Sequence, residues 1–172
     1  MTADLISLLW VFVGVSLVSV ALRIIHLFRA RAMRALAARW GFQYIGPPVP
    51  NWWNPAHPKI SPPLPAWFPL ACRPSGLRQV WNVIEGQQNG VSVLIFDSIV
   101  GSKGGHGYTV IACQTEQNPF GRVTSSDRVI QSHGWTVVHG VWFLFFSWTM
   151  GTKRVDKYVN RLRFGSVCER NC

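Results

Sequence analysis

Residues 5–22 read LISLLWVFVGVSLVSVAL, eighteen consecutive positions without a charged side chain. At about 1.5 Å per helical residue, this stretch is about 27 Å long, close to the hydrocarbon thickness of a bilayer. Apolar residues continue to Phe28, interrupted by Arg23 and His26. The pattern predicts a transmembrane helix in residues 1–28. A cleaved signal peptide and a helix buried in a protein core are the alternatives.

Basic residues follow this helix and do not precede it. Asp4 stands before it, and the next acidic residue along the chain is Glu85. Positive flanks stay in the cytoplasm, which predicts a single-pass protein of the inner (plasma) membrane with its N-terminus outside and its body cytoplasmic. We expect four arginines to contact anionic phospholipid headgroups: Arg23, Arg29, Arg31 and Arg34. A solvated helix face is the simpler alternative for them.

The helix is expected to continue through a basic juxtamembrane segment, and residues 29–46 hold this helix and a first strand. Met33, Leu36, Ala37 and Trp40 follow the spacing of one apolar helix stripe, and Gly41 is a suitable stop.

Residues 47–76 form the next unit, an arm rich in proline and tryptophan. Ten of the eleven prolines lie there, a density that neither a helix nor an interior strand tolerates. The tryptophans in this arm indicate that part of it packs on the domain or at the membrane interface. A proline-rich docking ligand is the alternative.

A sheet and a helix are predicted for residues 77–165, followed by a tail at 166–172. Asn89-Gly90 joins two apolar runs and predicts a hairpin. Expected strands are 80–85, 91–98, 108–115, 129–132, 135–139 and 141–148, the last two hinged near Gly140. An apolar stripe at Val155, Tyr158, Val159 and Leu162 predicts a helix. The fold class is therefore α+β: an antiparallel meander of about five strands with a covering C-terminal helix.

The apolar segment VWFLFFSWTM at 141–150 has a second interpretation. Residues 135–150 could cross the membrane again, although sixteen residues are few for a span. Their aromatic and β-branched content favours a strand. Contact of this face with the bilayer is a third alternative.

Candidate chemistry gathers around the glycine-rich segment GSKGGHG at 101–107. Lys103, His106 and Asp97 are the candidate binding residues: Lys103 with backbone N–H groups could hold a phosphate, and Asp97 with His106 could act in acid–base chemistry. The simpler interpretation is a hairpin loop closed by Asp97. No catalytic residue is assigned.

No metal site or cofactor is predicted. The cysteines (Cys72, Cys113, Cys168 and Cys172) lack the spacing of a zinc site or a disulfide framework. The net charge of +10 favours anionic partners, yet no nucleic-acid-binding motif occurs, so nucleic acid is not expected.

The phrase FPLACRPSGLRQVWNVIEGQQNGVSVLIFDSIVG, followed by YTVIA, resembles a group of uncharacterised bacterial membrane-anchored proteins. Their shared pattern falls here on Asn82, Gly86, Gly90, Phe96 and Asp97, and the late GW…WFLFFSW…VDKYVNRL is also similar. The resemblance implies a membrane location and a small sheet-rich domain, and it brings no activity.

Two functions are therefore considered. The first is a membrane-tethered, non-enzymatic module that binds lipid headgroups or a membrane protein partner on the cytoplasmic face. The alternative is a membrane-bound enzyme with its site at the 101–107 loop.

Overall fold

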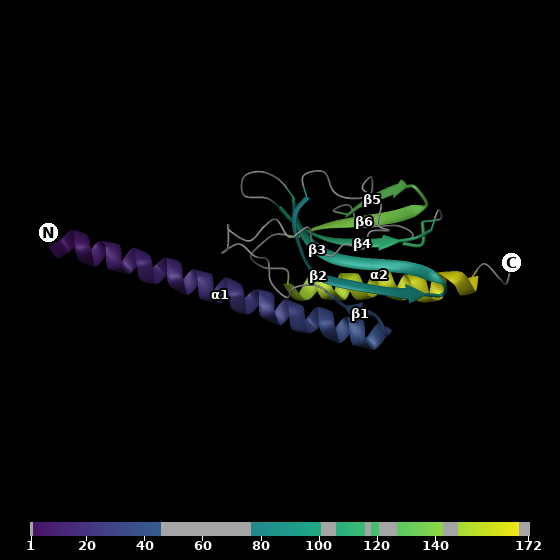
Figure 1. The fold of residues 1–172 in the computed structure, drawn as a ribbon, viewed down its shortest axis with the longest axis horizontal. Coiled ribbons are helices and arrows are strands. Elements are labelled where there is room, and N and C mark those ends of the chain that lie inside the picture. The colour runs from purple at the N-terminus through teal and green to yellow at the C-terminus, as the bar shows by residue number, and fades with distance from the viewer. Residues whose placement is uncertain are drawn as a thin grey trace.

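One long helix and a sheet-based domain make up the computed structural model, which describes residues 2–45, 77–100, 106–115, 118–120, 127–142 and 148–168. Helix α1 spans Thr2–Trp40 without a break. Its N-terminal half projects away from the domain and its C-terminal half lies against it (Figure 1). The predicted anchor and juxtamembrane helix are thus one rod of about 58 Å.

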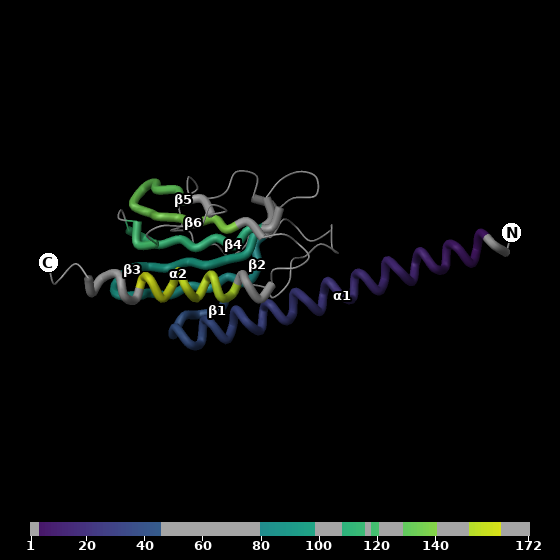
Figure 2. The backbone as a smooth tube through the Cα atoms, turned by 180° about the vertical axis from the view of Figure 1, so that it is seen from behind, coloured from purple at the N-terminus to yellow at the C-terminus, as the bar shows by residue number. Residues whose placement is uncertain are grey.

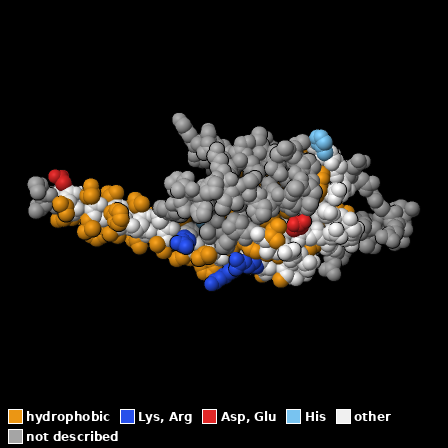
Figure 3. All heavy atoms as spheres, viewed as in Figure 1, with side chains coloured by type: hydrophobic (Ala, Val, Ile, Leu, Met, Phe, Trp, Pro, Cys, Tyr) orange, Lys and Arg blue, Asp and Glu red, His pale blue; other side chains and the backbone are white. Residues whose placement is uncertain are grey.

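The projecting half of α1 is apolar and exposed. Large hydrophobic side chains from Leu5 to Phe28 remain uncovered, and they form the orange surface of Figure 3, with Lys and Arg side chains where the helix meets the domain. Among the described helices, α1 is the one that is long and apolar enough to cross a membrane. A membrane span is therefore compatible with its length and composition.

A six-stranded antiparallel sheet forms the body of the domain. Its strands are β1 (Gln43–Tyr44), β2 (Leu77–Gln88), β3 (Val91–Val100), β4 (His106–Cys113), β5 (Asp127–Ser132) and β6 (Trp135–Trp142), in the order β1-β2-β3-β4-β6-β5. Helix α2 (Trp148–Cys168) follows. The predicted α+β class is confirmed: β2 to β6 are the five antiparallel strands expected after the arm, β1 falls where a first strand was expected, and β5 lies at an edge beyond β6.

The predicted hairpin joins β2 and β3. Asn89 and Gly90 both have positive φ, 52° and 78°, as a tight turn between right-twisted strands requires. The expected helix stop is also present, since Gly41 has a φ of 72° and its backbone reverses the chain into β1.

One face of the sheet packs against both helices (Figure 2). The stripe predicted on α2 is buried there, as are Met33, Leu36 and Ala37 of α1; the sheet contributes Ile84, Val93, Ile95, Ile111, Cys113 and Val138. The opposite face of the sheet carries a second buried apolar layer: Val80, Val83, Leu94, Phe96, Val110, Ala112, Trp135 and Val137. Both faces of the central strands are therefore buried, which explains why residues 93–96 of β3 are all apolar.

The C-terminal third differs from the prediction in three ways. Strand β6 runs through Gly140 without a hinge, because its backbone pairs with β4 on one side and β5 on the other. Trp148 begins a helix instead of ending a strand, and α2 continues past Gly165 to Cys168. Residues 135–142 belong to the sheet, so a helical span over 135–150 does not form. The predicted proline-rich arm lies outside the described residues.

Candidate functional site

A buried ion pair joins α1 to the centre of the sheet. Arg29 Nε and Nη2 each donate to a different carboxylate oxygen of Asp97, both at 2.7 Å. Arg29 is 3% exposed and Asp97 is fully buried. The planar guanidinium matches the carboxylate in this two-point arrangement, which fixes the orientation of both groups as well as their distance.

Neighbouring side chains complete the hydrogen bonding of the pair. Thr109 on β4 is the register partner of Asp97; its hydroxyl accepts from Arg29 Nη2 at 2.8 Å and donates to Asp97 Oδ1 at 2.8 Å. Asn82 Nδ2 donates to Asp97 Oδ2 at 2.8 Å. The carboxylate thus accepts four hydrogen bonds, and this set of Arg29, Asp97, Thr109 and Asn82 is called the junction cluster below.

A β-bulge in β2 brings Asn82 to the cluster. The β2–β3 register shifts between Trp81 and Ile84, and Asn82 has a φ of 52°, a left-handed conformation that asparagine tolerates better than most residues. The two consecutive residues Trp81 and Asn82 therefore both face α1: Trp81 meets the His26 ring edge-on at 5.9 Å, and Asn82 reaches the carboxylate. The bulge re-aims one side chain, a common use of bulges.

Tyr44 on β1 forms the outer end of the cluster. Its hydroxyl donates to Asn82 Oδ1 at 2.7 Å, and the Arg34 guanidinium lies 4.9 Å from its ring centre. Burial raises the pKa of the Tyr44 phenol, an effect that Arg34 opposes. Strand β1 is thereby tied to the same polar group as α1.

The structure separates the four arginines that were expected at lipid headgroups. Arg23, Arg31 and Arg34 are exposed on α1. Arg29 is not, and the expectation that it faces lipid or water is corrected: it lies four residues before Met33, on the helix face that packs against the sheet. A signal for this was present in the sequence and was missed: Arg29 lies on the apolar stripe of the helix, and an arginine buried there needs an acidic partner.

The three candidate residues around the glycine-rich loop are not brought together by any described contact. Asp97 bonds to Arg29, Asn82 and Thr109, as given above. His106 begins β4, where its backbone pairs with Val100, and its side chain lies outside the description. Lys103 lies outside the described residues altogether.

The described part of the chain contains neither a candidate metal site nor a reactive thiol. No group of three or more His, Cys, Asp or Glu side chains there could hold a metal ion. Cys113 is buried in the layer beneath the helices, and burial raises the pKa of its thiol far above the usual range. A thiol in such surroundings is a packing group and a poor nucleophile.

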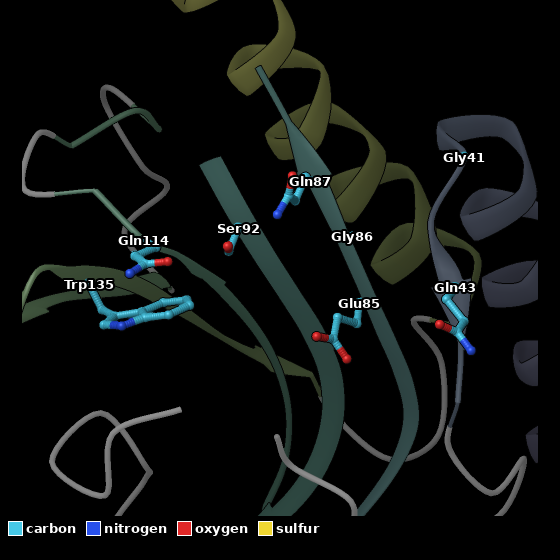
Figure 4. A pocket seen from close by; sticks show the side chains of 8 residues that line it. All are labelled: Gly41, Gln43, Glu85, Gly86, Gln87, Ser92, Gln114 and Trp135. Carbon is cyan, nitrogen blue, oxygen red and sulfur yellow. The ribbon is translucent and has the colours of Figure 1, made fainter. Parts of the chain in front are cut away.

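A polar pocket (Figure 4) opens on the other face of the sheet. It lies close to the β2–β3 hairpin, because its lining includes the register partners Gln87 and Ser92. Its volume is about 560 Å³, and it is lined by Gly41, Gln43, Glu85, Gly86, Gln87, Ser92, Gln114 and Trp135. This volume lies within the range of about 300–1,000 Å³ that small-molecule sites occupy.

Strand register builds the pocket floor as a row across four strands. Gln87 pairs with Ser92, Gln114 N donates to Ser92 O at 2.9 Å, and Trp135 stands one residue before Thr136, the partner of Cys113. Residues that face each other across strands share one face of the sheet, so Gln87, Ser92, Gln114 and Trp135 line up. No local pattern in the sequence indicates this row, because its members come from distant segments of the chain.

A second, shorter row extends the pocket toward α1. Gln43 of β1 pairs with Glu85 of β2, and Gly86 between the two rows turns its backbone toward Phe42 on the helix side. Beyond Glu85 the row becomes apolar, with Leu94 and Ala112 in the buried layer. The pocket is thus a polar end on an otherwise apolar sheet face.

The chain has no significant match among protein-family models, curated proteins or solved structures.

Proposed function

We infer that the chain is a membrane-tethered, non-enzymatic binding module. The observation that carries this is helix α1: one half is exposed and apolar, and the other half is built into the domain core through the junction cluster. A flexible linker would leave the domain free to move away from the bilayer. A continuous helix holds it at the surface in one orientation.

The length of α1 sets the distance between domain and bilayer. The twenty residues from Leu5 to Ile24 cover about 30 Å, the hydrocarbon thickness. Arg29 then lies only about 7 Å further along the axis, so the domain sits directly on the headgroup layer. The exposed Arg23 and Arg31 lie in reach of anionic headgroups, whereas Arg34 is about 15 Å from the hydrocarbon edge.

Binding is favoured over catalysis by the state of Asp97. The alternative of an enzyme at the 101–107 loop needs this carboxylate as an accessible group. Asp97 is instead buried and saturated by four hydrogen bonds, which is typical of a structural group. The polar pocket is the surface that we assign to the module.

Membrane tethering is tested by fractionation of the full chain in a bacterial host. Wild-type protein should sediment with membranes and resist alkaline carbonate extraction. Phe12→Arg with Val15→Arg places two charges near the middle of the span, each costing about 2.5–3.5 kcal/mol, and should release the chain. Ala35→Arg with Ala38→Arg adds the same charge to exposed positions beyond the span and should leave it bound. Equal release of both variants, or extraction of the wild type by carbonate, contradicts the proposal.

Orientation is tested separately with reporters at the C-terminus of the full chain. A fluorescent protein that matures only in the cytoplasm should be bright, and alkaline phosphatase, which is active only outside, should be silent. The opposite result would reverse the topology and move the domain to the outer side, leaving the tether itself unaffected.

A further inference from the structure

The polar side chains of the pocket have no partner among the residues that the structure describes. Gln43, Glu85, Gln87, Ser92 and Gln114 make no side-chain hydrogen bond or ion pair within the described part of the chain. The junction cluster, by contrast, satisfies every oxygen of its carboxylate. Five polar groups and one aromatic ring thus border a single cavity, and polar groups placed in this way can fix the orientation of a polar ligand.

The charge of the described pocket lining disfavours one large class of ligands. Glu85 is the only ionisable side chain in its described lining, although the whole chain carries +10. No Lys or Arg stands beside it among the described lining residues, and a carboxylate in such a lining repels phosphate and carboxylate groups. Nucleotides and phospholipid headgroups are therefore disfavoured here, and they fit the arginines of α1 better.

Extended peptides and apolar ligands fit less well. A peptide that adds a strand needs a free sheet edge. Beside the pocket the described sheet offers one only at β1 and at residues 86–88 of β2, because β3 and β4 are paired on both sides and β1 pairs with Ile84 and Glu85 alone. An apolar ligand would strip water from five polar groups and return no hydrogen bond, at a cost for each one. Three carboxamides and a hydroxyl both donate and accept, as the hydroxyl groups of a sugar do.

We propose that this pocket binds an uncharged, hydroxyl-rich ligand of the sugar class. Glu85 accepts from two neighbouring hydroxyls; Gln87, Ser92 and Gln114 hydrogen-bond along the row, and the Trp135 ring borders its far end (Figure 4). The assignment rests on the binding function proposed above and specifies the ligand class at the assigned surface. The pocket lies beside Gly41, just beyond the end of α1 that is opposite to its projecting half.

The test uses fluorine NMR of the full chain, labelled with 5-fluorotryptophan, in detergent micelles. Trp135→Phe identifies the Trp135 resonance among the nine tryptophans. Titration with neutral mono- and disaccharides should shift that resonance saturably, with a dissociation constant of about 1 mM for a ligand of about a dozen non-hydrogen atoms. Spermidine and AMP serve as the cationic and anionic probes and should leave it unchanged.

Matched variants separate pocket binding from indirect effects. Gln87→Leu and Ser92→Ala should each weaken binding about tenfold, the loss expected for one hydrogen bond. Gln88→Leu is the control, because Gln88 is the next residue on β2 and therefore faces the other side of the sheet; it should bind like the wild type. Unchanged resonances of the other tryptophans verify folding.

Three results overturn the assignment. The first is no saturable shift of the Trp135 resonance with any sugar at a concentration of tenfold the expected dissociation constant. The others are equal sugar binding by Gln87→Leu and Gln88→Leu, and a shift caused only by spermidine or AMP. Each leaves the tether standing if fractionation still finds the chain in the membrane. Loss of membrane binding by the wild type would instead remove the proposed function.

Discussion

Replacing Asp97 by asparagine should strongly destabilise the domain, because it leaves the buried Arg29 guanidinium without a counter-charge. The two side chains are 1% and 0% exposed, so water cannot compensate the lost partner. Removing one member of a buried pair costs about 3–5 kcal/mol. The asparagine amide also offers one oxygen where four donors converge, and its NH₂ group faces two of them in either orientation. The loss is a large share of the about 5–15 kcal/mol that holds a typical domain folded.

Urea unfolding of the full chain in non-ionic detergent, followed by near-ultraviolet circular dichroism, measures this cost. With an m-value of up to about 3 kcal/mol/M, the midpoint should fall by at least about 1 M. The matched control is Asp156→Asn, which breaks the exposed Arg39–Asp156 pair at 2.5 Å and should cost less than about 1 kcal/mol. Adding Arg29→Met to Asp97→Asn removes the orphan charge and should recover stability. A midpoint no lower than that of the control, or no recovery in the double variant, would refute the reasoning.

Three further outcomes follow from the packing. Gly86→Ala should lower the free energy of unfolding by about 1–3 kcal/mol, because the new Cβ would lie 2.2 Å from the buried Phe42 ring. The control Gly14→Ala, whose Cβ would have nothing within 4 Å, should be neutral. Equal urea midpoints for the two variants would contradict the contact with Phe42. Because the pKa of Tyr44 is raised in the folded state, the unfolded chain loses this proton at a lower pH, and the free energy of unfolding falls as pH rises above about 10. Tyr44→Phe should flatten this fall when urea midpoints are measured from about pH 8 to about pH 11. An unchanged pH dependence would contradict the raised pKa. Cys113, with its raised thiol pKa, should resist iodoacetamide in the native chain and react in urea, as mass spectrometry of the tryptic peptide reports; native labelling would contradict its burial.

Local signals predicted most of the elements. The Asn89-Gly90 turn needs positive φ at both residues, so it announces a hairpin wherever it joins apolar runs. The stripe on α2 and the stop at Gly41 likewise depend on neighbours within one or two turns. The strand expected at 141–148 is wrong, since β6 ends at Trp142 and Trp148 already begins α2.

Long-range pairing could not be predicted. Arg29 and Asp97 are 68 positions apart, and a run of arginines after an apolar helix has an adequate explanation at the membrane surface. Only the register of β2, β3, β4 and β6 reveals the row from Gln87 to Trp135, and register is a property of the folded sheet. Family membership, orientation and the identity of the membrane stay predictions.

Because α1 is continuous, the orientation of the domain follows the tilt of the transmembrane segment in its bilayer. Gly41, which lines the pocket, is seventeen positions beyond Ile24 at the hydrocarbon edge of the proposed span, and this length of helix forms an arm of about 25 Å. A lean of about 20°, common for single helices, swings the far end of such an arm sideways by about 9 Å. Lean responds to bilayer thickness, so a thinner or thicker membrane changes the height and direction in which the pocket is presented. A hinge anywhere between Ile24 and Gly41 would abolish that geometric link.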